Sequence, residues 1–229
     1  MSLVRSLQVK KQLLSANNMS KRHLRIAAFV SGSGSNLPAI IEAIESGYLN
    51  AEIVQIIASK YNIPAEIKAQ KYDIPYTVIS RQEHKGNIQA MGQSLMACLE
   101  PLKIDLILLC GYLSFLSSEF VAQYPNRIMN IHPSLLPAFG GKGAYGMNVH
   151  NSVIEYGSKV SGCTVMFVDA GADSGPIIIQ RSVQVSSSDN PDSLATKVMN
   201  EENIAYPEAI RLFSENRLLV DGRVVRILE

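Results

Sequence analysis

Short apolar runs alternate along the chain with stretches in which apolar residues recur every three or four positions. The runs are rich in β-branched residues, which is typical of buried strands, and the spaced stretches have the period of amphipathic helices. In the first part of the chain this pattern predicts strands over 24–30, 51–58, 76–79, 105–109 and 127–131, and helices over 37–44, from 64, over 84–99 and over 117–124.

The alternation changes after about residue 148, where longer strands expected to pair in an antiparallel or mixed way begin. Near the C-terminus, Asp221 and Gly222 stand between two apolar runs and predict a hairpin turn. The whole pattern predicts an α/β fold, an open, mostly parallel, twisted sheet with helices on both faces and mixed C-terminal strands. The later elements are expected as a helix over 148–156, strands over 160–168 and 176–185, and a helix over about 192–213.

Residues 23–229 read as a single domain, because no repeat or low-complexity linker divides them. Residues 1–22 precede the first core strand and are expected to form a flexible N-terminal tail, with a short helix around Val9 to Leu14. They lack the apolar segment and cleavage site of a signal peptide. No apolar run approaches the ~20 residues of a membrane span.

Composition narrows the class of partner. The 229 residues are 47% hydrophobic and 18% charged, with a net charge of +1. Because binding to a phosphate backbone needs clustered Lys and Arg, nucleic acid is not expected as a partner, and neither is a membrane. Cys98, Cys110 and Cys163 form no C-x-x-C pair, so the sequence predicts reduced thiols in a cytoplasmic protein rather than a disulfide framework or a zinc site.

Three polar motifs interrupt the apolar pattern, and the first is Ser31-Gly32-Ser33-Gly34-Ser35-Asn36, between a strand and a helix. A helix N-terminus offers unpaired N–H groups to an anion, and glycines let the backbone approach it closely. The motif lacks the third glycine of the dinucleotide fingerprint and the Gly-Lys-Ser/Thr of a P-loop. Taken alone it fits a phosphate site and an ordinary tight turn equally well.

The second motif, Asn130-Ile131-His132-Pro133-Ser134-Leu135-Leu136-Pro137, follows a predicted strand, at the edge where open α/β sheets bind ligands. Asn130 and His132 are two positions apart and therefore point to the same side. The third motif, Asp169 to Pro176, joins the two late strands, and its carboxylates could orient a histidine. Each motif also has an ordinary structural explanation. The second could be a strand end whose histidine is hydrogen-bonded within the fold, and the third could be an acidic turn.

The segments VSGSGSNL, NIHPSLLP and FVDAGADSGPIIIQ, in this order and at these separations, resemble the formyltransferase-fold family over residues 24 to 228. NIHPSLLP is shared with methionyl-tRNA formyltransferases and formyltetrahydrofolate hydrolases. Those relatives are expected to carry an extra domain, for which this chain has no residues. The Ser-Gly-Ser-Asn turn resembles the substrate phosphate loop of the members that formylate glycinamide ribonucleotide (GAR).

The resemblance implies that the protein transfers the formyl group of 10-formyltetrahydrofolate, its co-substrate, to the amine of GAR in purine biosynthesis, without a metal. The alternatives are a formyltetrahydrofolate hydrolase, another folate-dependent formyltransferase such as a sugar-nucleotide enzyme, and a non-catalytic folate- or nucleotide-binding module. Its partners would be small molecules, and the protein would act as a monomer or homodimer.

Carried over residue by residue, the resemblance also implies the site, with the phosphate loop in the N-terminal half and the folate and catalytic residues in the C-terminal half. The catalytic aspartate falls on Asp173 rather than Asp169, and Ser114 stands where an arginine is frequent. The implied residues are Asn130, His132 and Asp173 for catalysis; Ser33, Gly34, Ser35 and Asn36 for the substrate phosphate; Tyr112, Leu113, Ser114, Phe115, Leu116, Val168, Asp169, Ala170, Gly171 and Ala172 for folate; and Lys85, Lys142 and His150 as possible substrate contacts.

Overall fold

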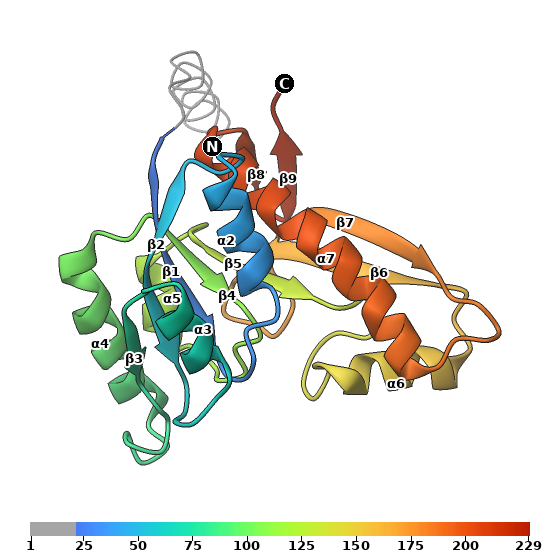
Figure 1. Ribbon diagram of the computed structural model, residues 1–229, viewed down its shortest axis with the longest axis horizontal. Helices are drawn as coiled ribbons and strands as arrows, with labels where there is room; N and C mark the ends of the chain where they lie inside the picture. The colour runs from blue at the N-terminus through green and yellow to red at the C-terminus, as the bar shows by residue number, and fades with distance from the viewer. Residues whose placement is uncertain (1–21) are drawn as a thin grey trace.

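The computed structural model describes residues 22–229, so the expected tail and its short helix around Val9 to Leu14 lie outside the described residues. Within these residues the strands form one nine-stranded sheet in the order β3-β2-β1-β4-β5-β6-β7-β9-β8 (Figure 1). The predicted α/β class, a mostly parallel sheet with helices on both faces and mixed C-terminal strands, is confirmed.

The first five strands are parallel, because each is joined to the next by a connection that crosses over the sheet. The strand order reverses between β1 and β4, and ligands bind at such a switch point in open α/β sheets. All five lie where the sequence predicts them: β1 (Leu24–Val30), β2 (Ala51–Ala58), β3 (Tyr76–Val78), β4 (Leu106–Leu109) and β5 (Ile128–His132).

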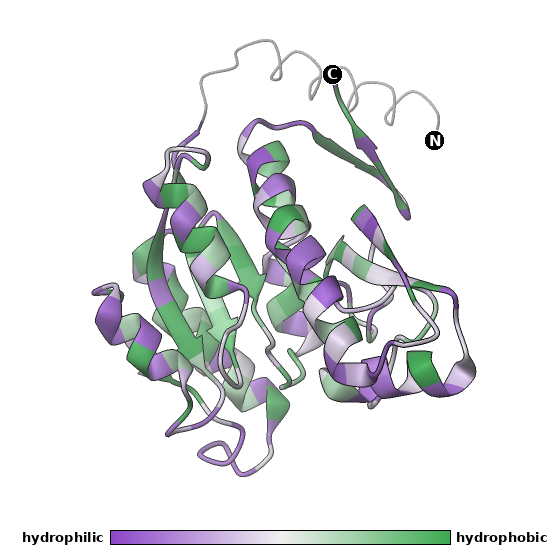
Figure 2. Cartoon of the chain, turned by 45° about the vertical axis from the view of Figure 1, so that its right-hand side comes forward, coloured by the Kyte–Doolittle hydropathy of each residue, from purple (hydrophilic) through white to green (hydrophobic). Residues whose placement is uncertain are grey.

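Buried side chains alternate between the two faces of the sheet. In β1, Ile26 and Ala28 contribute to one apolar core, and Ala27 and Phe29 to the other. The strands of the parallel half are accordingly apolar on both faces and mostly green in Figure 2, with a few hydrophilic positions. The first core is covered by α2 (Leu37–Glu45), α3 (Ala65–Lys71), α6 (Met147–Tyr156) and α7 (Pro191–Ser214), and the second by α4 (Ile88–Leu99) and α5 (Ser118–Gln123).

The later strands make the sheet mixed. β6 (Val160–Phe167) pairs antiparallel with both β5 and β7 (Ile177–Gln184), as expected. β8 (Leu218–Asp221) and β9 (Val224–Ile227) form the predicted C-terminal hairpin. Its turn residues are Gly222, at φ 61°, and Arg223, one position later than the Asp221-Gly222 pair that signalled it.

The helix predicted over 84–99 begins only at Ile88, so the first four predicted positions were wrong. Asn87 ends the preceding turns, and its side chain accepts a hydrogen bond from the Ala90 backbone N–H, as an N-cap does. The preceding residues are held in turns by Glu83, whose carboxylate accepts hydrogen bonds from the backbone and hydroxyl of Ser80. These turns replace the first predicted turn of α4. The helix ends at Leu99, as predicted, and a short 3₁₀ helix follows it (η1, Glu100–Leu102).

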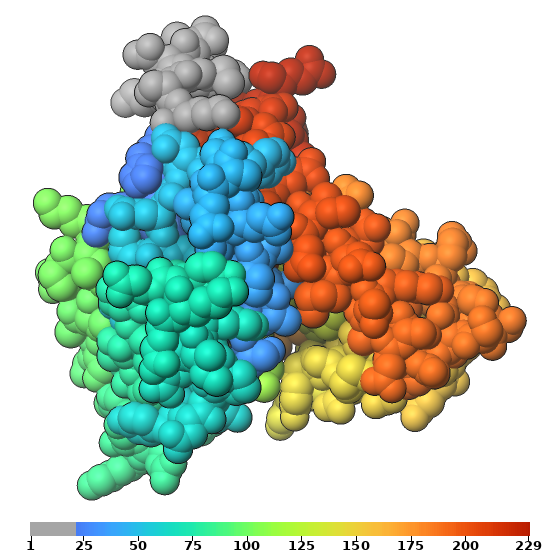
Figure 3. All heavy atoms as spheres, viewed as in Figure 1, coloured from blue at the N-terminus to red at the C-terminus, as the bar shows by residue number. Residues whose placement is uncertain are grey.

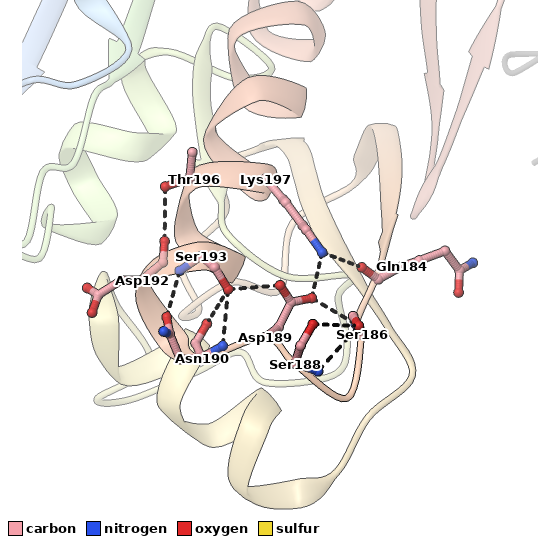
Figure 4. A network of polar contacts seen from close by, with 9 residues as sticks. All are labelled: Gln184, Ser186, Ser188, Asp189, Asn190, Asp192, Ser193, Thr196 and Lys197. Carbon is pink, nitrogen blue, oxygen red and sulfur yellow. Dashed lines mark hydrogen bonds and ion pairs between the residues drawn. The ribbon is translucent and has the colours of Figure 1, made fainter.

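A polar network fixes the start of α7 (Figure 4). Asn190 and Ser193 form a reciprocal capping box, and the Ser193 hydroxyl also donates to Asp189 at 2.8 Å. Lys197 donates to the same carboxylate at 2.6 Å, and this bond is the main reason that the pKa of Asp189 falls to about 2. The network anchors the long helix that packs against β6, β7 and α2.

Candidate active site

A cavity of about 540 Å³ opens at the carboxyl ends of β4 and β5, and its volume is in the range of small-molecule sites. It is bounded by segments that are far apart in the sequence. The surface is recessed where the yellow segment that leads into α6 faces the N-terminal half in Figure 3. The lining segments are 111–116 after β4, 130–133 at the end of β5, 141–146 before α6, and 168–173 between β6 and β7.

The three residues predicted to be catalytic meet at this cavity. Asn130 and His132 share one side of β5, as their two-residue spacing predicts, and both line the cavity with Asp173. The side chain of Asn130 forms no hydrogen bond with any described residue, so its amide protons are free for a ligand. The structure thus brings Asn130, His132 and Asp173 together, and their catalytic roles stay predictions.

His132 is held in one orientation. Its side chain is 4% exposed, and its Nε2 lies 2.9 Å from the carbonyl oxygen of Phe139. Because a carbonyl can only accept, Nε2 is the donor in this bond. The other ring nitrogen, Nδ1, is thereby turned toward Asp173 and lies 3.6 Å from its Oδ2. That distance is longer than a hydrogen bond, so the two groups face each other as a charge pair.

The two aspartates of the third motif have different hydrogen-bond partners. The Oδ1 of Asp169 accepts hydrogen bonds from the Gly171 N–H at 2.9 Å and the Ser174 hydroxyl at 2.7 Å, so it stabilises its own turn. Asp173 has a left-handed backbone, φ 52°, and its carboxylate accepts from the Gly141 N–H at 2.9 Å while facing His132. The geometry therefore favours Asp173 over Asp169 as the partner of His132.

The residues assigned to folate form the remaining walls. All ten line the cavity, and among them Leu113 and Phe115 are more than half exposed, an apolar surface available to a flat ring. Tyr112 packs edge-on against Phe29, with ring centroids 5.2 Å apart, and burial raises its pKa to about 12. Its phenol is therefore neutral near pH 7. Its buried hydroxyl makes no hydrogen bond of normal geometry with a described residue, although nearby Ser114 offsets part of the pKa shift.

The loop of the first motif lies beside the cavity rather than in its wall. Ser31 connects the two regions, because its N–H donates to the Gly111 carbonyl at 3.1 Å and its hydroxyl accepts from the Leu113 N–H at 2.8 Å. Within the described residues, no hydrogen bond uses the backbone N–H of any residue from 32 to 36. Consecutive unpaired N–H groups ahead of a helix form an anion-binding site. Ser33 and Ser35 are exposed there.

The side chain of Asn36, which the resemblance assigns to the substrate phosphate, is engaged elsewhere. Asn36 is buried, and its amide donates to Oε2 of Glu202 in α7 at 2.9 Å. A buried carboxylate is costly without a donor, and the amide of Asn36 supplies one. Burial raises the pKa of Glu202, and the bond from Asn36 offsets part of that shift. The same amide nitrogen lies 3.8 Å from the sulfur of Met199, so both amide protons face α7, and an anion at the loop would meet the backbone N–H of Asn36.

The three possible substrate contacts are separated by the structure. Lys142 lines the cavity. Lys85 lies in the turns before α4 and does not line it. His150 is buried in α6, and its pKa is lowered, first by burial and then by its electrostatic interaction with His132. The Nδ1 of His150 has no hydrogen-bond partner among the described residues.

Two charged residues near the site were missed by the sequence analysis. Glu202 occupies a position in the apolar stripe of α7, between Val198 and Tyr206, and a charged residue in such a stripe is the signal that could have identified it. Lys68 in α3 contacts the loop after β1, and nothing in its local sequence marks it. Among residues 22–229, no group of three His, Cys, Asp or Glu side chains could hold a metal ion, and no helix is long and apolar enough to cross a membrane.

Comparisons with known proteins agree with this geometry. Residues 24–210 match the family described as formyl transferase. A phosphoribosylglycinamide formyltransferase of Arabidopsis thaliana, chloroplastic, is 38% identical over 86% of this chain and 68% of its own length. One from Haemophilus influenzae is 34% identical, over 85% and 89%. The crystal structure of glycinamide ribonucleotide transformylase 1 from Symbiobacterium toebii, 37% identical, superposes with a TM-score of 0.84, over 90% and 95% of the two chains. The chain belongs to the formyl transferase family.

Proposed function

We propose that the protein transfers the formyl group of 10-formyltetrahydrofolate to the primary amine of GAR, giving formyl-GAR and tetrahydrofolate, in purine biosynthesis. The observation that carries the proposal is the placement of two different groups at one edge of the sheet. Unpaired backbone N–H groups suited to a phosphate follow β1, and Asn130, His132 and Asp173 meet at the end of β5. The relatives named for this reaction, in Arabidopsis thaliana and Haemophilus influenzae, support the choice of GAR.

The cavity fits the folate co-substrate. Leu113 and Phe115 offer apolar surface, and the backbone of the loop over 168–173 supplies polar groups for a heterocycle. Tyr112 adds a buried hydroxyl, which lies near Ser114. When bound, 10-formyltetrahydrofolate supplies the formyl carbon that the substrate amine attacks. These residues hold it with that carbon toward the end of β5.

The chemistry of transfer is assigned to three side chains. The free amide of Asn130 and the Nδ1 proton of His132 would donate to the formyl oxygen, on which negative charge develops as the amine nitrogen bonds to the carbon. One such donor is typically worth about 10²–10³ in rate. Asp173 would balance the charge of the protonated imidazole. It would also help move a proton from the attacking amine to N10, the nitrogen that leaves the formyl carbon.

The phosphate of GAR is assigned to Ser33, Gly34, Ser35 and Asn36. The backbone N–H groups of this loop and the start of α2 favour an anion without a metal ion. The bonds of Ser31 to Gly111 and Leu113 tie this loop to the folate wall, so that the two substrates would be held at a fixed separation.

The proposal also places the enzyme in the cytoplasm as a monomer or homodimer without nucleic acid. Cys110 and Cys163 are buried, and burial is the main reason that the pKa of each thiol is raised to about 12, so both stay protonated near pH 7 and react poorly. Cell fractionation tests the location, and light scattering after size-exclusion chromatography tests the assembly.

Release of tetrahydrofolate from 10-formyltetrahydrofolate, measured with and without GAR, tests the function. We expect release only when GAR is present, with one formyl-GAR formed for each tetrahydrofolate. Equal release without GAR would identify a hydrolase, and binding of folate without any release would identify a binding module. Release that needs another amine, such as an amino sugar nucleotide, would identify a different formyltransferase.

A further inference from the structure

Three successive carbonyl groups of the loop after β1 are bonded from the same helix. The carbonyl of Gly32 accepts a hydrogen bond from the N–H of Ala65, the first residue of α3, at 3.3 Å. The Nζ of Lys68, one turn further along α3, donates to the carbonyl oxygens of Ser33 at 2.6 Å and Gly34 at 3.2 Å. One side of the loop backbone is therefore held against α3.

This arrangement determines where the N–H groups of the loop point. In a planar trans peptide, the C=O of one residue and the N–H of the next point in opposite directions. When the carbonyls of residues 32, 33 and 34 face α3, the N–H groups of Ser33, Gly34 and Ser35 face away from it. These three belong to the set that has no acceptor among the described residues.

We propose that Lys68 is a positioning residue for the substrate phosphate, because it holds the Ser33 and Gly34 carbonyls and so aims the next two N–H groups at the anion. The proposal rests on the proposed function, in which this loop binds the phosphate of GAR. It assigns Lys68 no contact with the phosphate itself, since its ammonium is already engaged with the back of the loop.

The positive charge of Lys68 also makes the N–H groups of the loop stronger donors. No carboxylate of the described residues pairs with Lys68, so its positive charge is not cancelled locally, and partial burial lowers its pKa. A cation on a carbonyl oxygen polarises the peptide and makes its N–H a stronger donor. The loop is fixed at its other end by the bond between Asn36 and Glu202.

The conformation of the loop backbone also depends on contacts with other segments. Gly34 has a left-handed backbone, φ 58°, and a Cβ added there would lie 2.7 Å from Leu37. A glycine is free to adopt other conformations, so the position of its carbonyl depends on an external partner. The Gly34 carbonyl has two partners, the Leu37 N–H at 3.1 Å and Lys68 at 3.2 Å. Among the described residues Lys68 alone bonds the Ser33 carbonyl, so its loss would first free the peptide between Ser33 and Gly34 to rotate and turn its N–H away.

Lys68→Met tests the proposal, because methionine keeps the length and apolar stem of the side chain and removes the donors. We expect KM for GAR to rise about 10- to 100-fold, equivalent to about 1.4–2.8 kcal/mol of binding free energy. We expect KM for 10-formyltetrahydrofolate to stay unchanged and kcat at saturating GAR to change less than threefold. Lys68→Arg, which can still donate to two carbonyls, should recover most of the affinity.

Lys71→Met is the matched control, because Lys71 ends the same helix, is exposed and makes no contact with the loop; it should leave both KM values unchanged. A melting temperature for each variant separates loss of binding from loss of folding. An unchanged KM for GAR in folded Lys68→Met would overturn the proposal, as would equal losses for both substrates.

Ligand binding to the loop provides a second test that does not depend on kinetics. During a titration with ribose 5-phosphate, the backbone amide resonances of Ser33, Gly34 and Ser35 should shift, and the same shifts should be much smaller in Lys68→Met. Equal shifts in the two proteins would contradict a positioning role. Failure of the proposed function is a separate result, since it would appear as wild-type enzyme that releases no tetrahydrofolate in response to GAR.

Discussion

Oδ2 of Asp173 lies 3.6 Å from Nδ1 of His132, and the same oxygen accepts a hydrogen bond from Gly141. The glycine belongs to the loop that lines the cavity, and Phe139, just before it, accepts from the other nitrogen of His132. Both members of the pair are therefore oriented by one segment, residues 139–141. The position of this loop and the geometry of the pair are linked.

Replacement of either member of the pair should abolish transfer while folate still binds. We expect His132→Ala and Asp173→Asn each to lower kcat by about 10²–10⁴, because both are assigned to charge and proton handling rather than to affinity. Steady-state kinetics give the rate, and fluorescence titration with a non-reactive folate gives the dissociation constant, which should change less than threefold.

Asp169→Asn is the informative comparison for this prediction. Asp169 bonds Gly171 and Ser174 within its own turn, so its replacement should lower the melting temperature and reduce activity less than Asp173→Asn. If Asp173→Asn kept nearly wild-type turnover and Asp169→Asn lost it, the assignment of the aspartates would have to be reversed.

Glu202→Gln should stabilise the protein increasingly as pH rises. Burial raises the pKa of Glu202 above its ordinary 4.5, so the folded state favours the protonated form. Its contribution to stability is present below pH 4.5 and is lost as pH rises through the folded pKa. Glutamine does not titrate and can still accept from Asn36. Urea unfolding between pH 4 and 8 should show a difference in unfolding free energy that grows with pH.

Glu208→Gln is the control for this pH series. Glu208 lies on the same helix but is half-buried and 3.9 Å from Arg181, so its replacement should not produce a gain that grows with pH. A free energy of unfolding that responds to pH identically in wild type and Glu202→Gln would show that Glu202 is not buried as an unfavourable charge.

Gly175→Ala should distort the segment from Asp169 to Pro176, which carries Asp173. A Cβ at Gly175 would lie 1.8 Å from the carbonyl oxygen of Phe167, so the backbone on one side must move. We expect a loss of about 1–3 kcal/mol in unfolding free energy, typical of overpacking, together with a fall in kcat. Gly162→Ala is a matched case away from this segment, because its Cβ would meet the carbonyl of Arg181 at 2.0 Å. Similar destabilisation with activity lost in both variants would argue against a specific effect on Asp173.

Much of this architecture follows from patterns that are local in sequence. The run from Leu24 to Val30 predicted β1 at its observed bounds, because a strand buried on both faces has an unmistakable apolar composition. The pairing of Asn130 with His132 followed from the period of a strand, and the hairpin near Gly222 from its turn chemistry. Helix starts were less predictable, and α4 began four residues late because an N-cap outweighed the apolar period.

Contacts between distant segments could not be predicted in this way. The amide of Asn36 looked free for an anion, and only the packing of α7 against α2 shows that Glu202 occupies it. Lys68 has the appearance of an ordinary surface lysine, since its carbonyl partners lie more than thirty residues earlier in the chain. A single sequence gives the chemical groups at each position but not which of them already have partners.

The loop around Lys142 should order when substrate binds. Gly140, Gly141, Gly143 and Gly146 surround Lys142, and the loop forms one wall of the cavity. No other Lys or Arg lines the cavity within residues 22–229, so an anionic part of either substrate would find its countercharge there. We expect Lys142→Ala to raise KM for one substrate about two- to tenfold, the range of a partly exposed charge pair, with little change in kcat.

Limited proteolysis gives the independent measurement for this loop. Because closure over the substrates would exclude water, GAR and a folate analogue together should slow cleavage between residues 140 and 146. Lys159→Ala is the matched control, since Lys159 is exposed and outside the cavity, and neither KM should change. If ligands gave no protection and Lys142→Ala left both KM values unchanged, the segment would be a surface insertion that orients His132 and Asp173 through its backbone alone.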